Sequence, residues 1–227
     1  MPDWVSVERR KLMELYGAKI YLISKEEGGF GEAIKRADAY AKNIGGFRPN
    51  QFDNFDNVIV HYNTTAEEIL DKIKVTSIVL GIGTGGTLMG IGKKFKEIDE
   101  SIKVLAMEPK TLPLLSKGIS EGSHKIEGIG DDFIPNIVDK TIIDDVIVID
   151  DIDAINMARK LASELGLGVG ISSGANFLAA AISNDGNKTV TIFADDNKKY
   201  LSTNLVDKVK DDSFISNYIE LIDYEVL

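Results

Sequence analysis

Apolar residues recur with two different periods along the chain and predict strands that alternate with helices. Short apolar runs predict buried strands at 75–80, 102–107, 142–149 and 189–193. Helical spacing predicts helices at 6–17, 31–43, 64–72, 87–98, 152–165 and from about 173 onward. An alternation of this kind is typical of an α/β protein with a mostly parallel sheet.

The first fifty residues predict a smaller unit, with one strand at 18–23 between two helices. This is too little for an independent parallel domain. The polar, turn-rich segment PNQFDNFDN begins at Pro49 and marks a boundary. We therefore expect a partial small lobe over residues 1–50 and a large lobe over residues 51–227, closed by a helix from Asp211 onward.

The strand that begins at Val75 runs into a loop that is rich in glycine and threonine. The segment Gly81–Thr87 reads GIGTGGT, and a helix is predicted to start near Thr87. Because glycine has no Cβ, a ligand can approach the backbone closely, and free N–H groups at a helix start attract a phosphate. The alternative is that the glycines only make a tight turn between strand and helix.

Composition and charge mainly exclude classes of partner. The chain has 26 Lys and Arg against 36 Asp and Glu, a net charge of −10, which argues against nucleic acid and anionic membranes as partners. It has no cysteine, no signal peptide and no long apolar span, so we expect a cytoplasmic protein. His61 and His124 lack ligand-like spacing. We expect no metal and assign both histidines a structural role.

In an open parallel sheet, ligands bind beyond the carboxyl ends of the strands, and the residues found there allow two interpretations. The loop formally matches GxGxxG, and Glu108 at the end of the next strand would then bind a ribose, as in an NAD-binding Rossmann half. Alternatively, the loop holds the single phosphate of pyridoxal phosphate while a serine elsewhere meets the pyridine nitrogen. A serine there favours elimination and replacement at Cβ over transamination.

The order of short motifs decides between these interpretations. They are QFDN at 51–54, HYNTT at 61–65, GIGTGGT at 81–87, EP at 108–109, HKIEGIG at 124–130, FIP at 133–135, GISSGA at 170–175 and KYLST at 199–203. Over essentially the whole chain this series resembles the cysteine synthase (O-acetylserine sulfhydrylase) family. The resemblance implies an α/β fold of the fold-type II, tryptophan synthase β-like class, with a twisted, mostly parallel sheet flanked by helices.

The resemblance also implies a cofactor, partners and site residues. The cofactor would be pyridoxal 5'-phosphate in the lobe 51–227, the substrate a small amino acid, the assembly a homodimer, and a further partner the C-terminal tail of serine acetyltransferase. Ser172 would bond the pyridine nitrogen, and Gln51 would help to bind the substrate carboxylate; the structural alternatives are a helix cap and a hinge. The phosphate would be held by Gly83, Thr84, Gly85, Gly86 and Thr87. The mouth of the active site would be lined by Gly128, Ile129 and Gly130.

The sequence departs from the family in its missing lysine motif. The asparagine- and serine-rich motif that carries the Schiff-base lysine does not occur, and neither does the Thr-Ser-Gly-Asn substrate loop. The first twenty residues resemble an interior stretch of the family, after its first third. We therefore expect a fragment that lacks the N-terminal third, a truncated reading frame, or a non-catalytic paralogue that acts as an interaction module.

A second departure is the pair Asp131 and Asp132, where the family usually has small residues. Two carboxylates at the mouth would act as a general base toward water, or would repel anionic sulfide. The intact enzyme would then be a cysteine lyase that releases hydrogen sulfide and forms serine, rather than a dedicated synthase. The structural alternative is a solvated acidic turn.

Overall fold

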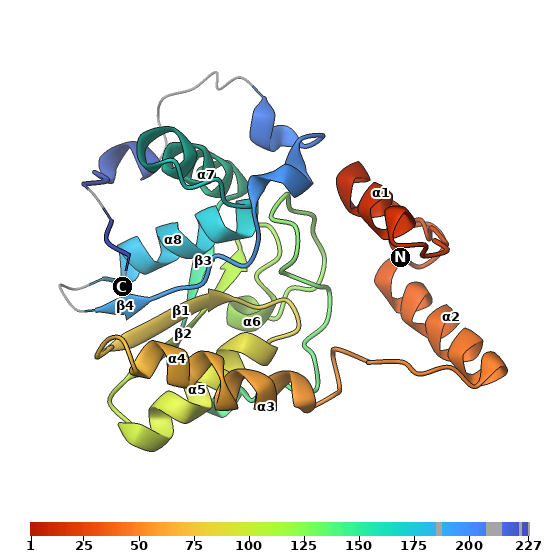
Figure 1. The fold of residues 1–227 in the computed structure, drawn as a ribbon, viewed down its shortest axis with the longest axis horizontal. Coiled ribbons are helices and arrows are strands. Elements are labelled where there is room, and N and C mark those ends of the chain that lie inside the picture. Colours follow the sequence, from red (N-terminus) through yellow and green to blue (C-terminus); the bar gives the residue numbers. More distant parts are fainter. Residues whose placement is uncertain (185–187, 208–214, 223, 227) are drawn as a thin grey trace.

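The computed structural model describes residues 1–184, 188–207, 215–222 and 224–226 of the 227-residue chain. In this part of the chain, four parallel strands form one sheet in the order β3-β2-β1-β4. They are β1 Ser77–Gly81, β2 Lys103–Pro109, β3 Asp145–Ile149 and β4 Thr189–Val190. The predicted parallel α/β architecture is confirmed (Figure 1).

Helices cover both faces of the sheet (Figure 1). One face carries α7 Asp151–Leu165 and α8 Ile171–Ser183, and the other carries α3 Asp56–Asn63, α4 Thr65–Leu70 and α5 Gly86–Ile98. Side chains of β1 alternate between the two cores: Ile78 and Leu80 pack with α5, whereas Val79 packs with α7 and α8. A strand buried on both faces is apolar at successive positions, which explains its sequence.

Shorter elements complete the body. They are the helix α6 Leu114–Lys117 and the 3-10 turns η1 Lys140–Ile142, η2 Asn197–Tyr200, η3 Asn204–Val206 and η4 Ile215–Tyr218. The described part of the chain contains no helix long and apolar enough to cross a membrane, and no group of three or more metal-ligating side chains.

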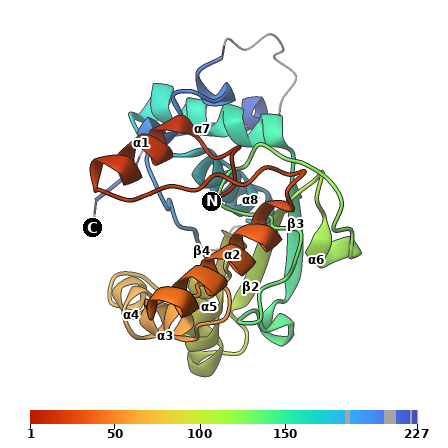
Figure 2. The ribbon, with the colours of Figure 1, turned by 90° about the vertical axis from the view of Figure 1, so that its right-hand side faces the viewer.

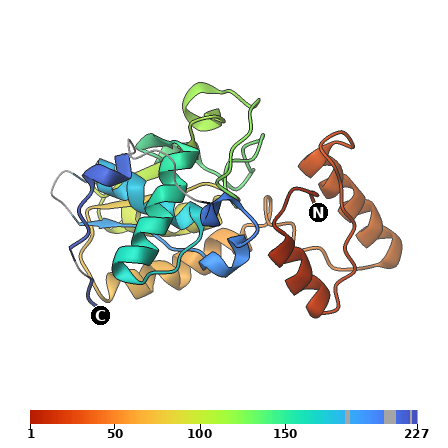
Figure 3. The same cartoon turned by 90° about the horizontal axis from the view of Figure 1, so that it is seen from above.

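The N-terminal segment lies to one side of this body. Its helices are α1 Val7–Leu15 and α2 Gly29–Ile44, as predicted within two residues. Figures 1 and 3 show α2 apart from the sheet, reached by the connecting segment 45–55, and Figure 2 shows both helices from their outer side. A division into lobes at residue 50 stays a prediction.

The structure differs from the predicted elements in four places. The prediction of a strand at 18–23 is wrong. Ile23 makes only an isolated bridge to Pro2, and the described residues offer no neighbouring strand to pair with this segment. Helix α3 was not expected. Strand β4 ends at Val190 because the Thr191 hydroxyl bonds the Val79 carbonyl oxygen at 2.7 Å. Of the closing helix expected from Asp211, residues 211–214 lie outside the described residues, and η4 is a single 3-10 turn.

Candidate cofactor site

The carboxyl end of β1 and the start of α8 lie at the same edge of the sheet. The Gly81 N–H donates to Asn176 Oδ1 at 2.8 Å, which fixes α8 against the end of β1. Ser172 precedes Asn176 by one helical turn, so it lies about 6 Å further along the helix axis, beyond the strand end. The edge therefore brings together the glycine loop and the serine pair that are ninety residues apart in sequence.

The loop after β1 presents unpaired backbone donors. Gly85 has a left-handed conformation, with φ 88°, and leads into α5 without a side-chain cap. The N–H groups of Gly83, Thr84, Gly85 and Thr87 make no hydrogen bond within the described residues. Amides aimed from a loop and a helix start into one place form a concavity that suits an anion.

Helix α3 orients the two threonines of this loop. Asn57 Nδ2 donates to Thr84 Oγ1 at 3.0 Å, and that oxygen also accepts from the Gly86 N–H at 3.2 Å. His61 Nε2 lies 3.1 Å from Thr87 Oγ1, while its Nδ1 lies 2.9 Å from Thr65 Oγ1. Both hydroxyls are thus held by side chains of one helix.

Two glycines of the loop allow close approach of neighbouring groups. A Cβ on Gly83 would overlap the Gly128 carbonyl oxygen, and a Cβ on Gly86 would overlap the Asn57 side chain. A side chain at position 83 would displace backbone, and one at position 86 would displace the Asn57 side chain, so packing favours glycine at both positions.

The serine pair begins α8. Ser172 is 6% exposed, and its Oγ has no hydrogen-bond partner within the described residues. Ser173 is fully buried, and its Oγ is also unpaired. Gly170, not a serine, is the N-cap residue, and the structure records no side-chain cap. The alternative role of these serines as helix caps is therefore not supported.

Gln51 lies beside the loop. Its carbonyl oxygen accepts from Asn57 Nδ2 at 3.0 Å, and the same amide group bonds Thr84. The Gln51 side chain is exposed. Its position is compatible with contact to a ligand in the loop.

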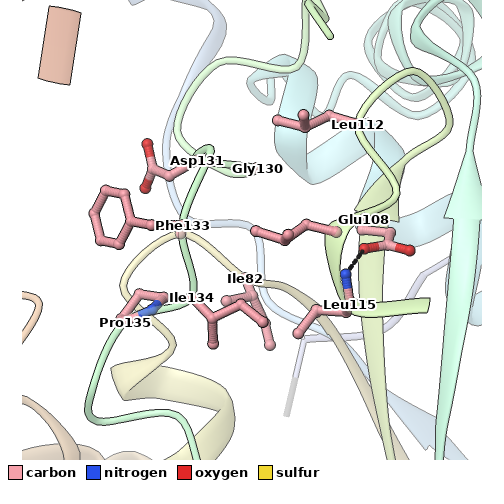
Figure 4. Close-up of a pocket in the computed structure, with 11 residues that line it drawn as sticks. Ile82, Glu108, Leu112, Leu115, Gly130, Asp131, Phe133, Ile134 and Pro135 are labelled. Atoms are coloured by element: carbon pink, nitrogen blue, oxygen red, sulfur yellow. Dashed lines mark hydrogen bonds between the residues drawn. The ribbon is translucent and has the colours of Figure 1, made fainter. Parts of the chain in front are cut away.

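Of the three predicted mouth residues, Gly130 lines a pocket next to the loop (Figure 4), whereas Gly128 and Ile129 are not among its lining residues. Gly130 and Asp131 lie there with Ile82 and Gly83, and the Gly130 N–H donates to the Ile82 carbonyl oxygen at 2.9 Å. Gly128 follows Glu127 and faces Gly83, with Ile129 against Gly81.

The two aspartates differ in their surroundings. Asp131 is half-buried, whereas Asp132 is exposed. Burial, and then the charge of Asp132, raise the pKa of Asp131 to about 6. A carboxyl group with this pKa exchanges protons near neutral pH.

Glu108 does not serve the role that a dinucleotide site would give it. It is 4% exposed and accepts hydrogen bonds from the N–H groups of Leu115, at 2.7 Å, and Ser116, at 3.1 Å, and from the Ser116 hydroxyl. Figure 4 shows it bonded to Leu115, on the opposite side of the pocket from Asp131. Because its oxygens hold the start of α6, the Rossmann alternative loses its ribose ligand.

Three side chains of the site were missed or given another role. Asn57 and Asn176 carry no motif of their own, although each is a buried or partly buried amide beside a predicted loop or helix start. His61 was assigned a structural role, and the structure places it in contact with Thr87. Only the unexpected helix α3 brings Asn57 and His61 to the loop.

Comparison with known proteins identifies the family. The model for pyridoxal-phosphate dependent enzymes matches residues 1–195. Cysteine synthase B from Campylobacter jejuni is 42% identical over 210 residues, covering 90% of this chain and 70% of that protein. The solved structure of a hydrogen sulfide-producing enzyme from Fusobacterium nucleatum is 45% identical, with a TM-score of 0.88, over 95% of this chain and 68% of that one.

A third relative is named for a different product, cystathionine. The O-acetylserine dependent cystathionine β-synthase from Helicobacter pylori is 37% identical, with a TM-score of 0.84, over 91% of this chain and 69% of that one. The resemblance to cysteine synthases drawn from the motifs is confirmed. Since the family model spans most of the sequence, the chain belongs to the family of pyridoxal-phosphate dependent enzymes.

Proposed function

We propose that this chain binds pyridoxal phosphate at the edge formed by β1, α5 and α8, for β-replacement or β-elimination in cysteine metabolism. The observation that carries the proposal is that unpaired donors occur on the two segments that the Gly81–Asn176 hydrogen bond holds together: the amides of the loop on one and the Ser172 hydroxyl on the other. This donor set fits a phosphate monoester carried by an aromatic ring whose nitrogen accepts a hydrogen bond. When bound, the cofactor supplies an electron sink for a negative charge at the substrate Cα.

The loop residues would hold the phosphate. Gly83 and Gly85 contribute unpaired backbone N–H groups near the start of α5, where the helix dipole favours negative charge. Gly86 begins that helix, and its N–H donates to Thr84 Oγ1 at 3.2 Å. Thr84 and Thr87 add hydroxyls that α3 holds in place. Through the phosphate, these loop residues would fix the position of the ring.

Ser172 would donate to the pyridine nitrogen. A neutral hydroxyl leaves this nitrogen largely unprotonated, unlike a carboxylate, and so favours chemistry at Cβ. Gln51 would bind the substrate carboxylate, and Gly128, Ile129 and Gly130 would line the mouth. Each of these roles is a proposal for the residue at its observed position.

The primary reaction we propose is that of a cysteine synthase: O-acetylserine and sulfide give cysteine and acetate. It is supported by relatives that are named cysteine synthases at 39–42% identity. The small amino-acid substrate follows from the same relatives.

Asp131 favours a second candidate reaction, in which cysteine and water give serine and hydrogen sulfide. Its carboxyl group lines the pocket beside Gly83, and a pKa of about 6 suits a general base that removes a proton from water. The exposed Asp132 would assist through its charge. A relative from Fusobacterium nucleatum is a hydrogen sulfide-producing enzyme.

Binding tests the proposed site. Pyridoxal phosphate and its phosphate-free analogue pyridoxal are titrated into the chain and into Ser172→Ala. We expect the phosphate ester to bind at least about tenfold more tightly, since a charge-assisted contact contributes roughly 1.5–3 kcal/mol. Equal affinities for the two compounds would rule out the proposed phosphate site.

Sulfide release separates the two reactions. It is measured from cysteine with a full-length version of the protein that carries the Schiff-base lysine motif, and with Asp131→Asn in the same background. The lyase proposal predicts a loss of roughly 10²–10⁴-fold in the variant, while unchanged sulfide release would leave only the synthase reaction. Homodimer formation, binding of a serine acetyltransferase tail and a cytoplasmic location stay predictions, to be tested by sedimentation, peptide titration and cell fractionation.

A further inference from the structure

A partly buried polar cluster joins α1 to two segments of the body. We call it the Arg9 cluster; it consists of Arg9, Glu127, Asp195 and Tyr200. Arg9 Nη2 donates to the Tyr200 hydroxyl at 2.6 Å and lies 3.4 Å from Asp195 Oδ2, and Arg9 Nη1 donates to the Glu127 carboxylate. The guanidinium carbon also lies 4.6 Å from the centre of the Tyr200 ring. Figures 1 and 3 show α1 beside the segment that contains η2.

Glu127 belongs to the wall of the cofactor site that contacts the phosphate loop. The next residue is Gly128, whose carbonyl oxygen packs directly against Gly83. Three residues after Glu127, the Gly130 N–H donates to the Ile82 carbonyl oxygen. A shift of Glu127 would therefore change the position of the loop that we propose holds the phosphate.

Asp195 belongs to the opposite wall, which carries Ser172. Its carbonyl oxygen accepts from the Gly170 N–H at 3.0 Å, and its Oδ1 packs against Gly170 so closely that a Cβ there would overlap it. Gly170 is the N-cap of α8, two residues before Ser172. The position of Asp195 thus helps to set the position of the serine.

The electrostatics of the cluster depend on one guanidinium group. Glu127 and Asp195 face the same cation and are both largely shielded from water. Burial raises the pKa of Glu127, the Arg9 charge lowers it, and the Asp195 charge raises it, so the two carboxylates interact. Lys199 Nζ lies 3.7 Å from Asp195 Oδ2, but it does not bond Glu127. Removing Arg9 would leave two carboxylates that repel each other across the cluster.

We propose that Arg9 is a positioning residue that holds the two walls of the cofactor site at a fixed separation, by pairing Glu127 of one wall with Asp195 of the other. The inference rests on the proposed cofactor site for its consequence, but its geometry is independent of any ligand. We call this pairing the clamp. Because Arg9 lies in the N-terminal unit, the clamp also couples docking of α1 to the shape of the site.

The chain offers a matched control on the same helix. Arg10 bonds the carbonyl oxygens of Val5, at 3.1 Å, and Asp3, both within the N-terminal unit. Arg10→Gln therefore removes the same charge from α1 without touching either wall, whereas Arg9→Gln removes the clamp. Arg9→Lys keeps the charge but loses the forked donor geometry.

Amide hydrogen exchange of the ligand-free chain tests the clamp directly. The reporters are the N–H of Gly130, bonded to Ile82, and the N–H of Gly170, bonded to Asp195. We expect Arg9→Gln to speed exchange at both by at least about tenfold, Arg9→Lys by less, and Arg10→Gln to leave both unchanged. Exchange that is unchanged at both amides in Arg9→Gln would overturn the proposal.

Cofactor binding and a rescue variant give the second readout. Pyridoxal phosphate should bind Arg9→Gln at least about tenfold more weakly than the parent chain. In Arg9→Gln/Glu127→Gln the repulsion between the carboxylates is removed but the pairing is not restored, so we expect only partial recovery of the affinity. A double variant that binds as tightly as the parent chain would contradict the proposal, because it would show that pairing by Arg9 is not needed. If the parent chain binds no pyridoxal phosphate, the proposed function fails, and the exchange data alone decide the role of Arg9.

Discussion

Asn176 on α8 and Gly81 at the end of β1 are joined by a hydrogen bond of 2.8 Å from the Gly81 N–H to Asn176 Oδ1. The amide of the same side chain donates to the Ile192 carbonyl oxygen at 2.9 Å. A 5% exposed side chain thus satisfies one donor and one acceptor of the backbone where two strands end. It fixes the start of α8, and with it Ser172, relative to the glycine loop.

Replacing Asn176 by Ala should destabilise the fold by about 2–4 kcal/mol, because a partly buried N–H and a partly buried carbonyl each lose their partner. Urea denaturation measures the loss. Ser183→Ala, at the far end of the same helix, is the control and should change the stability by less than about 0.5 kcal/mol. If Asn176→Ala were equally mild, the side chain would not be what fixes α8.

The two threonines of the loop should contribute to binding of the phosphate group and not to binding of the pyridine ring. Thr84→Val and Thr87→Val each remove a hydroxyl, and each should weaken pyridoxal phosphate binding by about tenfold. Binding of pyridoxal, which lacks the phosphate, should stay within about twofold. Calorimetric titration measures both, with the exposed Thr141→Val as the control. Equal losses for both compounds would mean that the threonines shape the loop and make no contact with a phosphate.

Asp131 should make stability depend on pH. Its pKa is raised to about 6, so the folded state favours the protonated carboxyl group. The stabilisation by this group is fully present below about pH 4, where the unfolded chain is also protonated, and is lost as pH rises through about 6.

Asp131→Asn should therefore be more stable than the parent chain above about pH 7, by on the order of 2 kcal/mol, and the difference should vanish below about pH 4. Urea titrations at several pH values measure this. Asp132→Asn removes only the weaker cause of the shift and should give a smaller gain. A gain that is the same at pH 4 and pH 8 would show that titration of Asp131 is not responsible.

The hydrogen bonds of Glu108 distinguish a pyridoxal phosphate site from a dinucleotide site. Its carboxylate is occupied by Leu115 and Ser116, so NAD should not raise the melting temperature of the chain. Pyridoxal phosphate at a hundred times its Kd should stabilise the chain by about 2.7 kcal/mol. Differential scanning fluorimetry with both compounds measures this. A rise with NAD alone would restore the Rossmann interpretation.

The sequence predicted those parts of the fold that local patterns determine. The β-branched run around Ile78 and Val79, followed by glycines, favours a strand buried on both faces. Asp150 and Gly166 bound α7 because one accepts from the Ile152 N–H and the other adopts φ 70°. The segment at 18–23 has a strand-like composition, but strand formation needs a partner strand, which composition cannot reveal.

The candidate site was only partly predictable for the same reason. The loop at 83–87 and the serines at 172–173 carry motifs, so they could be named in advance. Asn57 and Arg9 act through contacts with residues 27 or more positions away, and nothing in their own neighbourhood indicates those partners. Their roles depend on how α3 and α1 pack, which is a property of the tertiary structure.

The most direct measurement follows backbone amide resonances of the chain as pyridoxal phosphate is added. The account predicts that resonances of the loop, from Gly83 to Thr87, and those of Ser172 and Ser173 shift together with one binding constant, while those of α2 do not move. Shifts confined to only one of the two segments, or different binding constants for them, would contradict a single ligand held between the loop and the serine.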